Sequence, residues 1–433
     1  MKNRIKQYLL AASMCVGLTA CSDFFEPIPG VQFGLDETFA SKQRTEEYLN
    51  NVYSYVREVT DAIHPNTYGG IFTEASLDGA NRWNKTYAEW TNGSFNSASA
   101  QASEYFSKYY QAIAKASTFI QNVDKCTEAA ASTRGKWKSE ARALRAYYYF
   151  ELLRLYGPIP LIGEDPIPLD ASLEELIKER NSVDECVNFI ATELQSAIDS
   201  GDLLQRAGKA NLGRMDVATC MALKAKLYLY WASPLFNGNT DQASVKNKDG
   251  KQLFPQTEDN SKWAQARDAY ERFMTFATGQ GYKLTEVYTN GKLDPYASCR
   301  AAGEFFTTTW EAVDELIFVK LRDLYDYTYW VCPKFTDFQD TDVTGGGGYY
   351  TTQETVDLFF TKDGLTIEED PGYDKFEGIP SANNFTSGRY YDPNNPSRLY
   401  FDADKSKVLK QWKDREPRFY VNITYSGSIW LNE

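Results

Sequence analysis

Apolar residues recur at helical spacing in six stretches of the chain. Spacings of three and four residues predict amphipathic helices, and they occur over 45–56, 109–123, 139–156, 182–198, 215–234 and 263–277. Ser182 and Glu185 form a capping box at the start of the fourth stretch. Pro234 ends the fifth stretch, because proline cannot continue a helix. The pattern predicts a mainly α-helical protein.

The stretch 139–156 carries two apolar rows, whereas a surface helix usually carries one. One row consists of Ala141, Leu144, Tyr148, Leu152 and Leu155, and the other of Ala143, Tyr147 and Phe150. Gly157 and Pro158 mark the end of this helix. A helix that is apolar on two sides packs between neighbours on both sides. We therefore expect stacked helices, and we assign the aromatic run 147–150 to packing.

Small residues at four-residue intervals accompany several of these helices. Ala218 and Ala222, in the fifth stretch, allow close approach of a neighbour, as in helical repeats of the tetratricopeptide type. Insertions rich in Gly, Asn, Thr, Asp and aromatic residues interrupt the repeats near 57–100 and 278–349. Within the second insertion, the β-rich run 314–321 predicts a strand. We expect tetratricopeptide-like helical repeats (an α-solenoid) with long loop-rich insertions carrying short strands.

The first residues of the chain have the order of a secretory signal. A basic start and a short apolar run over 8–18 lead through small residues to Cys21. A cysteine at the expected cleavage site is the pattern of bacterial lipoproteins, in which residues 1–20 are removed and Cys21 is lipidated. A plain cleaved signal with an incidental cysteine is the alternative.

Charge and cysteine usage narrow the function classes. The 433 residues carry a formal net charge of −13, and removal of three basic residues and no acid with 1–20 makes it −16. Without a basic patch, the chain does not fit a nucleic-acid partner, and no later stretch is apolar enough to span a membrane. The cysteines are widely spaced, which argues against a disulfide framework or a zinc site. Cys186 and Cys220 lie on apolar helix faces and are assigned to the core.

Five motifs, in order along the chain, resemble those of the SusD-like (RagB/SusD) outer-membrane lipoproteins of Bacteroidetes nutrient-uptake systems. They are EARALRAYYYFELLRLYGPIPLI, GRMDVATCMALKAKLYLY, WAQARDAYERFM, DELIFVKLRD and DREPRF. The resemblance runs from Cys21 to the end of the chain and implies one SusD-like domain over 21–433. Members of the family usually continue beyond a stretch such as RFYVNITYSGSIWLNE, so the resemblance implies a C-terminally truncated domain.

The resemblance also implies a binding protein without catalytic activity. Such proteins are lipid-anchored at the surface of the cell outer membrane, as a lid over a SusC-like TonB-dependent transporter. They hold oligosaccharides or starch-like glycans, or in some relatives peptides, while the repeat helices face the transporter. A peptide-binding role, or a gating lid without ligand affinity, is the alternative within the same system.

The segment 74–95 has the residue types that a sugar site needs. Sugar rings present an apolar face to flat aromatic side chains, and their hydroxyls bind Asn, Asp and Arg. The candidates in this segment are Asp78, Arg82, Trp83, Trp90 and Asn92. The resemblance supports all of these except Trp83 as part of the family's ligand surface.

Aromatic residues are also crowded over 324–332, where one short strand could not bury them all. The candidates for ligand contact there are Tyr325 and Trp330, with Tyr296 in the same insertion. The alternative for each aromatic side chain, in both segments, is core packing beneath a long loop.

Catalytic chemistry has few candidate residues. The single histidine, His64, precedes a proline in a turn-like sequence, without a Ser or Cys nucleophile motif. A glycosidase needs two carboxylates, and 59 acidic residues leave a surface glycoside hydrolase as an alternative. The run 368–370 is assigned to a solvated loop. The segment 391–396 could supply oxygen ligands to calcium, and the alternative for it is a plain Pro-Asn turn. No cofactor and no metal are predicted.

Overall fold

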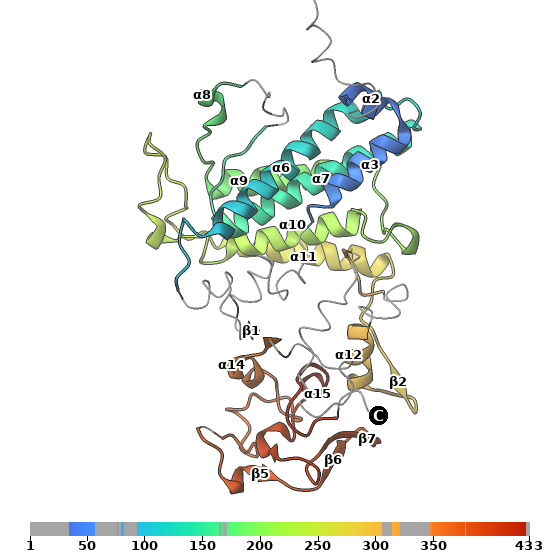
Figure 1. The fold of residues 1–433 in the computed structure, drawn as a ribbon, viewed down its shortest axis with the longest axis vertical. Helices are drawn as coiled ribbons and strands as arrows, with labels where there is room; N and C mark the ends of the chain where they lie inside the picture. The colour runs from blue at the N-terminus through green and yellow to red at the C-terminus, as the bar shows by residue number, and fades with distance from the viewer. Residues whose placement is uncertain are drawn as a thin grey trace, which may run out of the picture.

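The computed structural model describes residues 34–56, 76, 79–81, 93–163, 167, 171–304, 314–320, 347, 349–376 and 378–429. These residues form two parts, an array of long helices and a C-terminal unit of short strands and helices (Figure 1). We use the name C-terminal unit for residues 349–429 together with the helix α12 (Pro295–Glu304), which contacts it.

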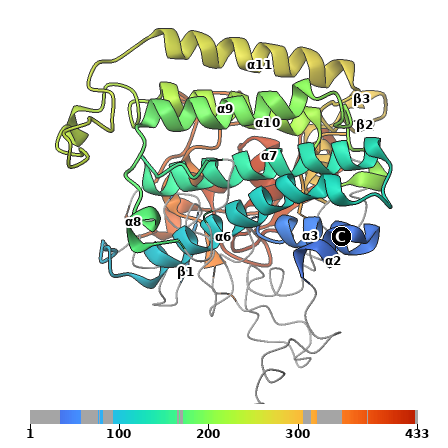
Figure 2. The same ribbon diagram turned by 90° about the horizontal axis from the view of Figure 1, so that it is seen from above.

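The helical array consists of six long helices that follow one another in the chain. They are α3 (Lys42–Tyr53), α6 (Ala100–Asn122), α7 (Ala131–Tyr156), α9 (Val183–Asp199), α10 (Val217–Ala232) and α11 (Ser261–Gly279). From α6 onwards each of these helices packs against the next, and they lie side by side in Figure 2. The short helices α2 (Leu35–Ala40) and α8 (Leu173–Leu176) flank the array. Each of the six predicted helices is present, and the mainly α-helical fold is confirmed.

Helix α7 is the centre of the array. It packs between α6 and α9, and Tyr147, Tyr148, Tyr149 and Phe150 are all buried. The Tyr148 hydroxyl donates to the Val52 carbonyl at 2.5 Å, and the Tyr149 hydroxyl donates to the Ile162 carbonyl at 2.7 Å. These hydrogen bonds satisfy the hydroxyls, which need partners when a tyrosine is buried. The burial of all four rings confirms the predicted packing role of this aromatic run.

Helix α7 also buries a charged side chain, that of Arg145. Arg145 is fully buried, and its guanidinium donates to Glu193 of α9 at 2.8 Å and to Ser117 of α6 at 3.1 Å. Burial of an arginine costs free energy unless its donors are satisfied. The ion pair therefore belongs to the packing of three consecutive helices.

Short strands complete the described residues, in four antiparallel pairs. The pairs are β1 (Ala80–Asn81) with β4 (Tyr349–Tyr350), β2 (Tyr288–Thr289) with β3 (Lys292–Leu293), β5 (Phe385–Thr386) with β8 (Val408–Leu409), and β6 (Arg389–Asp392) with β7 (Asn395–Asp402). The C-terminal unit also contains α14 (Gln353–Asp357) and α15 (Pro417–Asn422). Its buried residues Tyr400, Phe401 and Val408 form a cluster of their own.

The strand predicted over 314–321 is wrong for residues 314–320, which form turns and irregular backbone. Single contacts hold this segment against the array. Asp314 pairs with Arg206 at 2.9 Å, the Ile317 carbonyl accepts from Thr219 at 3.3 Å, and Lys320 donates to the Val56 carbonyl at 2.6 Å. A β-rich sequence becomes a strand only where a partner strand pairs with it, and here α10 and two non-helical segments supply the contacts. Leu321 lies outside the described residues.

Cysteines within the described part of the chain are free, and Cys186 and Cys220 are buried as predicted. In the same part, none of the helices combines the length and the apolar character that crossing a membrane requires.

Candidate ligand-binding site

Most of the predicted site residues lie outside the described residues. They are Asp78, Arg82, Trp83, Trp90, Asn92, Tyr325, Trp330 and the lipidation site Cys21. Their roles remain predictions. The described residues do, however, show what lies beside part of this sequence.

The β1–β4 pair brings the two insertions together. Ala80 pairs with Tyr350, and Asn81 pairs with Tyr349, in antiparallel register. Asp78 and Arg82 flank β1 in the sequence. The predicted ligand segment 74–95 is thereby joined to the start of the C-terminal unit.

Tyr296 is the one predicted ligand residue that the structure describes. Its half-buried ring lies 5.5 Å from the ring of Tyr400, and the guanidinium carbon of Arg398 lies 4.2 Å from its centroid. Arginine over an aromatic face is a stabilising cation–π contact. This environment matches the packing alternative for Tyr296.

Two carboxylates hold Arg398 in place over Tyr296. Its guanidinium donates to both oxygens of Asp294 at 2.9 Å and to Asp392 at 2.6 Å. The hydrogen bonds from Arg398 hold the pKa of Asp294 well below its ordinary value. Asp392 also accepts from the Asn394 backbone N–H at 2.8 Å, through its other carboxylate oxygen. This hydrogen bond matches the turn that is the alternative for 391–396.

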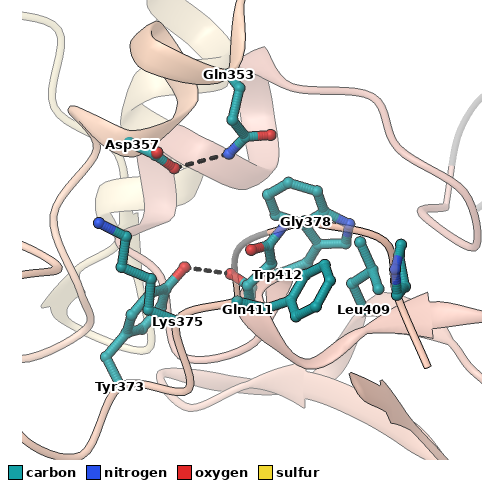
Figure 3. A pocket seen from close by; sticks show the side chains of 10 residues that line it. Gln353, Asp357, Tyr373, Lys375, Gly378, Leu409, Gln411 and Trp412 are labelled. Atoms are coloured by element: carbon teal, nitrogen blue, oxygen red, sulfur yellow. Dashed lines mark hydrogen bonds between the residues drawn. The ribbon is translucent and has the colours of Figure 1, made fainter. Parts of the chain in front are cut away.

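A cavity of about 400 Å³ lies in the C-terminal unit (Figure 3). Helix α14 faces the segment 409–412 across it. The lining combines aromatic and apolar residues with amides, one carboxylate and one ammonium group: Gln353, Asp357, Tyr373, Lys375, Phe376, Gly378, Pro380, Leu409, Gln411 and Trp412. Since β4 ends only three residues before Gln353, the paired insertions lead directly into this wall.

Hydrogen bonds fix the polar residues of the cavity. Gln353 donates to the Asp357 carboxylate at 2.7 Å within α14, and the Tyr373 hydroxyl donates to the Gln411 carbonyl at 2.6 Å (Figure 3). Burial raises the pKa of Tyr373, against the opposing effect of Arg415. Tyr373 is therefore a neutral donor at physiological pH.

Arg415 does not line the cavity but holds two of its walls together. It is 2% exposed, and it donates to the Val356 carbonyl at 2.5 Å and to the Phe359 carbonyl at 2.8 Å. It also donates to the Tyr373 hydroxyl at 2.5 Å. One guanidinium thus joins the end of α14 to the loop that carries Tyr373, because its planar fork presents several donors at once.

The sequence interpretation missed this cavity. Its lining comes from three short segments, over 353–357, 373–380 and 409–412, and none of them has a recognised binding pattern. The sequence feature that could have indicated it is Trp412, an aromatic residue two positions before the motif DREPRF at 414–419. That motif contains Arg415, which connects the walls of the cavity.

Metal ligation has no candidate among the described residues, because no three His, Cys, Asp or Glu side chains there gather closely enough to hold an ion. In the run 368–370, Glu368 and Glu369 are exposed. Asp370 accepts from the backbone N–H of Gly372 at 2.8 Å, which is the geometry of a turn.

Two sequence-family models match the chain. One, described as "Starch-binding associating with outer membrane", is a SusD-like model and matches residues 32–229. The other, described as "SusD family", matches residues 315–433. Together they span roughly three quarters of the chain.

Individual relatives agree with these matches. A SusD-like protein of Bacteroides ovatus is 27% identical over 175 residues, which make up 39% of this chain and 30% of that protein. Among solved structures, BT4246 is similar with a TM-score of 0.69 and 25% identity, over 88% of this chain and 64% of its own.

A SusD-like protein (BF3747) from Bacteroides fragilis has a TM-score of 0.60 and 20% identity, over 90% of this chain and 62% of its own. The chain therefore spans less than two thirds of the length of each of these relatives.

Proposed function

The chain belongs to the SusD/RagB family, and from this premise we propose that it is a surface glycan-binding protein. It captures oligosaccharides at the outer membrane, where a lipid on Cys21 anchors it, and delivers them to a SusC-like TonB-dependent transporter. The observation that carries the proposal is the match of residues 32–229 to a starch-binding, outer-membrane-associating family.

We place the main ligand surface on the two predicted segments. Trp83, Trp90, Tyr325 and Trp330 act as stacking platforms, and Asp78, Arg82 and Asn92 bind hydroxyls. The pairing of β1 with β4 supports this placement, because it joins the first segment to the second insertion. Tyr296 stays among the candidate ligand residues, with its ring held by Arg398 and Tyr400.

Affinity electrophoresis of the full chain in detergent, through gels containing starch, laminarin, xylan or mannan, tests the proposal. We expect one polysaccharide to retard the protein. Loss of an aromatic platform removes about 1.5–3 kcal/mol of apolar burial, so Trp90→Ala or Trp330→Ala should weaken retardation about tenfold or more.

Trp263→Ala is the matched control, since Trp263 is an exposed tryptophan on α11 and belongs to neither segment. Retardation of this variant should equal that of the wild type. If no polysaccharide retards the wild type, glycan capture is wrong, and a peptide ligand or a gating role takes its place. Release of new reducing ends would instead identify a glycoside hydrolase.

A further inference from the structure

The cavity between α14 and the segment 409–412 lies apart from both predicted aromatic segments in the sequence. We propose that it is a separate subsite that binds one neutral sugar residue of the glycan. This inference rests on the proposed function and adds a second place of contact to it.

Trp412 supplies the stacking surface of this subsite. Its indole ring is only partly buried, and it packs against Phe419 at 5.8 Å and 23° and against Tyr425 at 5.9 Å and 36°. The two aromatic neighbours fix the orientation of the ring before a ligand arrives. A preorganised aromatic face loses little conformational entropy when a sugar ring covers it.

The opposite wall supplies hydrogen-bonding groups. The 2.7 Å bond between Gln353 and Asp357 uses one amide hydrogen and one carboxylate oxygen. The amide keeps a second N–H and its carbonyl, and the carboxylate keeps further lone pairs. Neighbouring hydroxyls of a sugar need this mixture of donors and acceptors.

The charges of the lining favour a neutral ligand. Asp357 is the one carboxylate and Lys375 the one ammonium group among the described lining residues. Lys375 already lies 3.3 Å from a carboxylate oxygen of Glu368, outside the lining. A uronic acid would place its carboxylate near that of Asp357, and the two negative charges would repel each other. Lys375 would offset this repulsion little, because it is already paired with Glu368.

The dimensions suit a small unit of glycan. A volume of about 400 Å³ is at the lower end of the range for small-molecule sites. Such a cavity has room for one sugar ring. Because β4 leads into α14 within three residues, a glycan that lies on the segment beside β1 can extend toward the cavity.

Saturation-transfer difference NMR on the full chain tests the subsite with four probes: the methyl glycosides of glucose, galactose and mannose, and the methyl glycoside of glucuronic acid. We expect signals from at least one neutral glycoside and none from the glucuronide. Asp357→Ala and Gln353→Ala should weaken binding of that glycoside about tenfold, since each removes hydrogen bonds to a hydroxyl.

Glu354→Ala is the matched control, because Glu354 is exposed on the same short helix and does not line the cavity. Equal signals from Asp357→Ala, Gln353→Ala and this control would overturn the subsite. So would the absence of any glycoside signal from a wild-type protein that a polysaccharide retards in gels, which would leave the proposed function standing. Failure of the proposed function is seen separately, as the absence of retardation.

Discussion

Arginines that are buried or mostly buried organise both parts of the molecule at the scale of single residues. In the array, Arg145 pairs with Glu193 across two helices. In the C-terminal unit, Arg398 joins α12 to the β6–β7 hairpin through Asp294 and Asp392, whereas Arg415 bonds to backbone carbonyls and a tyrosine hydroxyl. Each arginine connects segments that are distant in sequence, so each substitution has consequences away from its own position.

The Asp294–Arg398 pair makes the stability of the C-terminal unit depend on pH. Because the folded pKa of Asp294 is depressed, its stabilisation is fully present above the unfolded pKa of about 3.9 and is lost as pH falls below it. We expect Asp294→Asn to lower the free energy of unfolding at neutral pH and to have a smaller effect in acid. Urea denaturation followed by tyrosine and tryptophan fluorescence measures both values.

An effect of Asp294→Asn that grows on acidification would contradict the linkage. Asp268→Asn serves as the control, since Asp268 forms an exposed pair with Arg267 on α11, and exposed pairs contribute little. Its effect on stability should be small at either pH.

Single residues also show where sequence interpretation reaches its limit. Trp412 and Gln353 face one cavity although 59 positions separate them in the chain. From the sequence, Tyr296 is a candidate for ligand contact. In the structure, the Arg398 guanidinium from β7 lies over its ring. Such contacts depend on the tertiary arrangement of short segments, which periodicity along the chain does not encode.

At the scale of elements, the helices were predictable and the strands were not. The array helices have a strong apolar period, and Ser182 and Glu185 form the predicted capping box at the start of α9. The strands, by contrast, are mostly two residues long, too short for an alternating pattern. The run 314–320 was predicted as a strand and is none. Its residues favour β structure, but without a partner strand they form irregular backbone.

The end of α7 gives a prediction for an element boundary. Gly157 has φ +67° and ψ −134°, a combination that residues with a Cβ rarely adopt. A Cβ there would also lie 3.0 Å from the Phe254 ring. We expect Gly157→Ala to lower the free energy of unfolding by about 1–3 kcal/mol, measured by urea denaturation with circular dichroism.

Gly163→Ala is the matched control for that change. Gly163 has no positive φ, and an added Cβ there would meet nothing within 4 Å. Its substitution should leave stability nearly unchanged. Equal stability of the two variants would show that the conformation of Gly157 is not required.

At the scale of the whole molecule, the described apolar residues separate into distinct cores. One cluster runs from Phe39 to Phe254, a smaller cluster joins α10 to α11, and a third forms around Tyr400, Phe401 and Val408. Local unfolding follows such units. The array and the C-terminal unit should therefore respond independently to substitutions.

Arg415→Lys tests this independence. The lysine keeps the charge and loses the fork that binds two carbonyls and Tyr373, at a cost of about 3 kcal/mol. In hydrogen exchange with mass spectrometry, peptides from 349–429 should exchange roughly a hundredfold faster, while those of α7 are unchanged. Arg418→Lys is the control, since the Arg418 side chain is exposed where it pairs with Glu416. Acceleration throughout the array would reveal a single cooperative unit.

The β1–β4 pair sets an order of folding for the molecule. Pairing Ala80 with Tyr350 closes a loop of about 270 residues, whereas from α6 to α11 each array helix meets the next one along the chain. Contacts between neighbours in sequence form quickly, and those between distant segments form slowly. We therefore expect the array to fold first. The junction that joins the two insertions should form last, after both strands have come together.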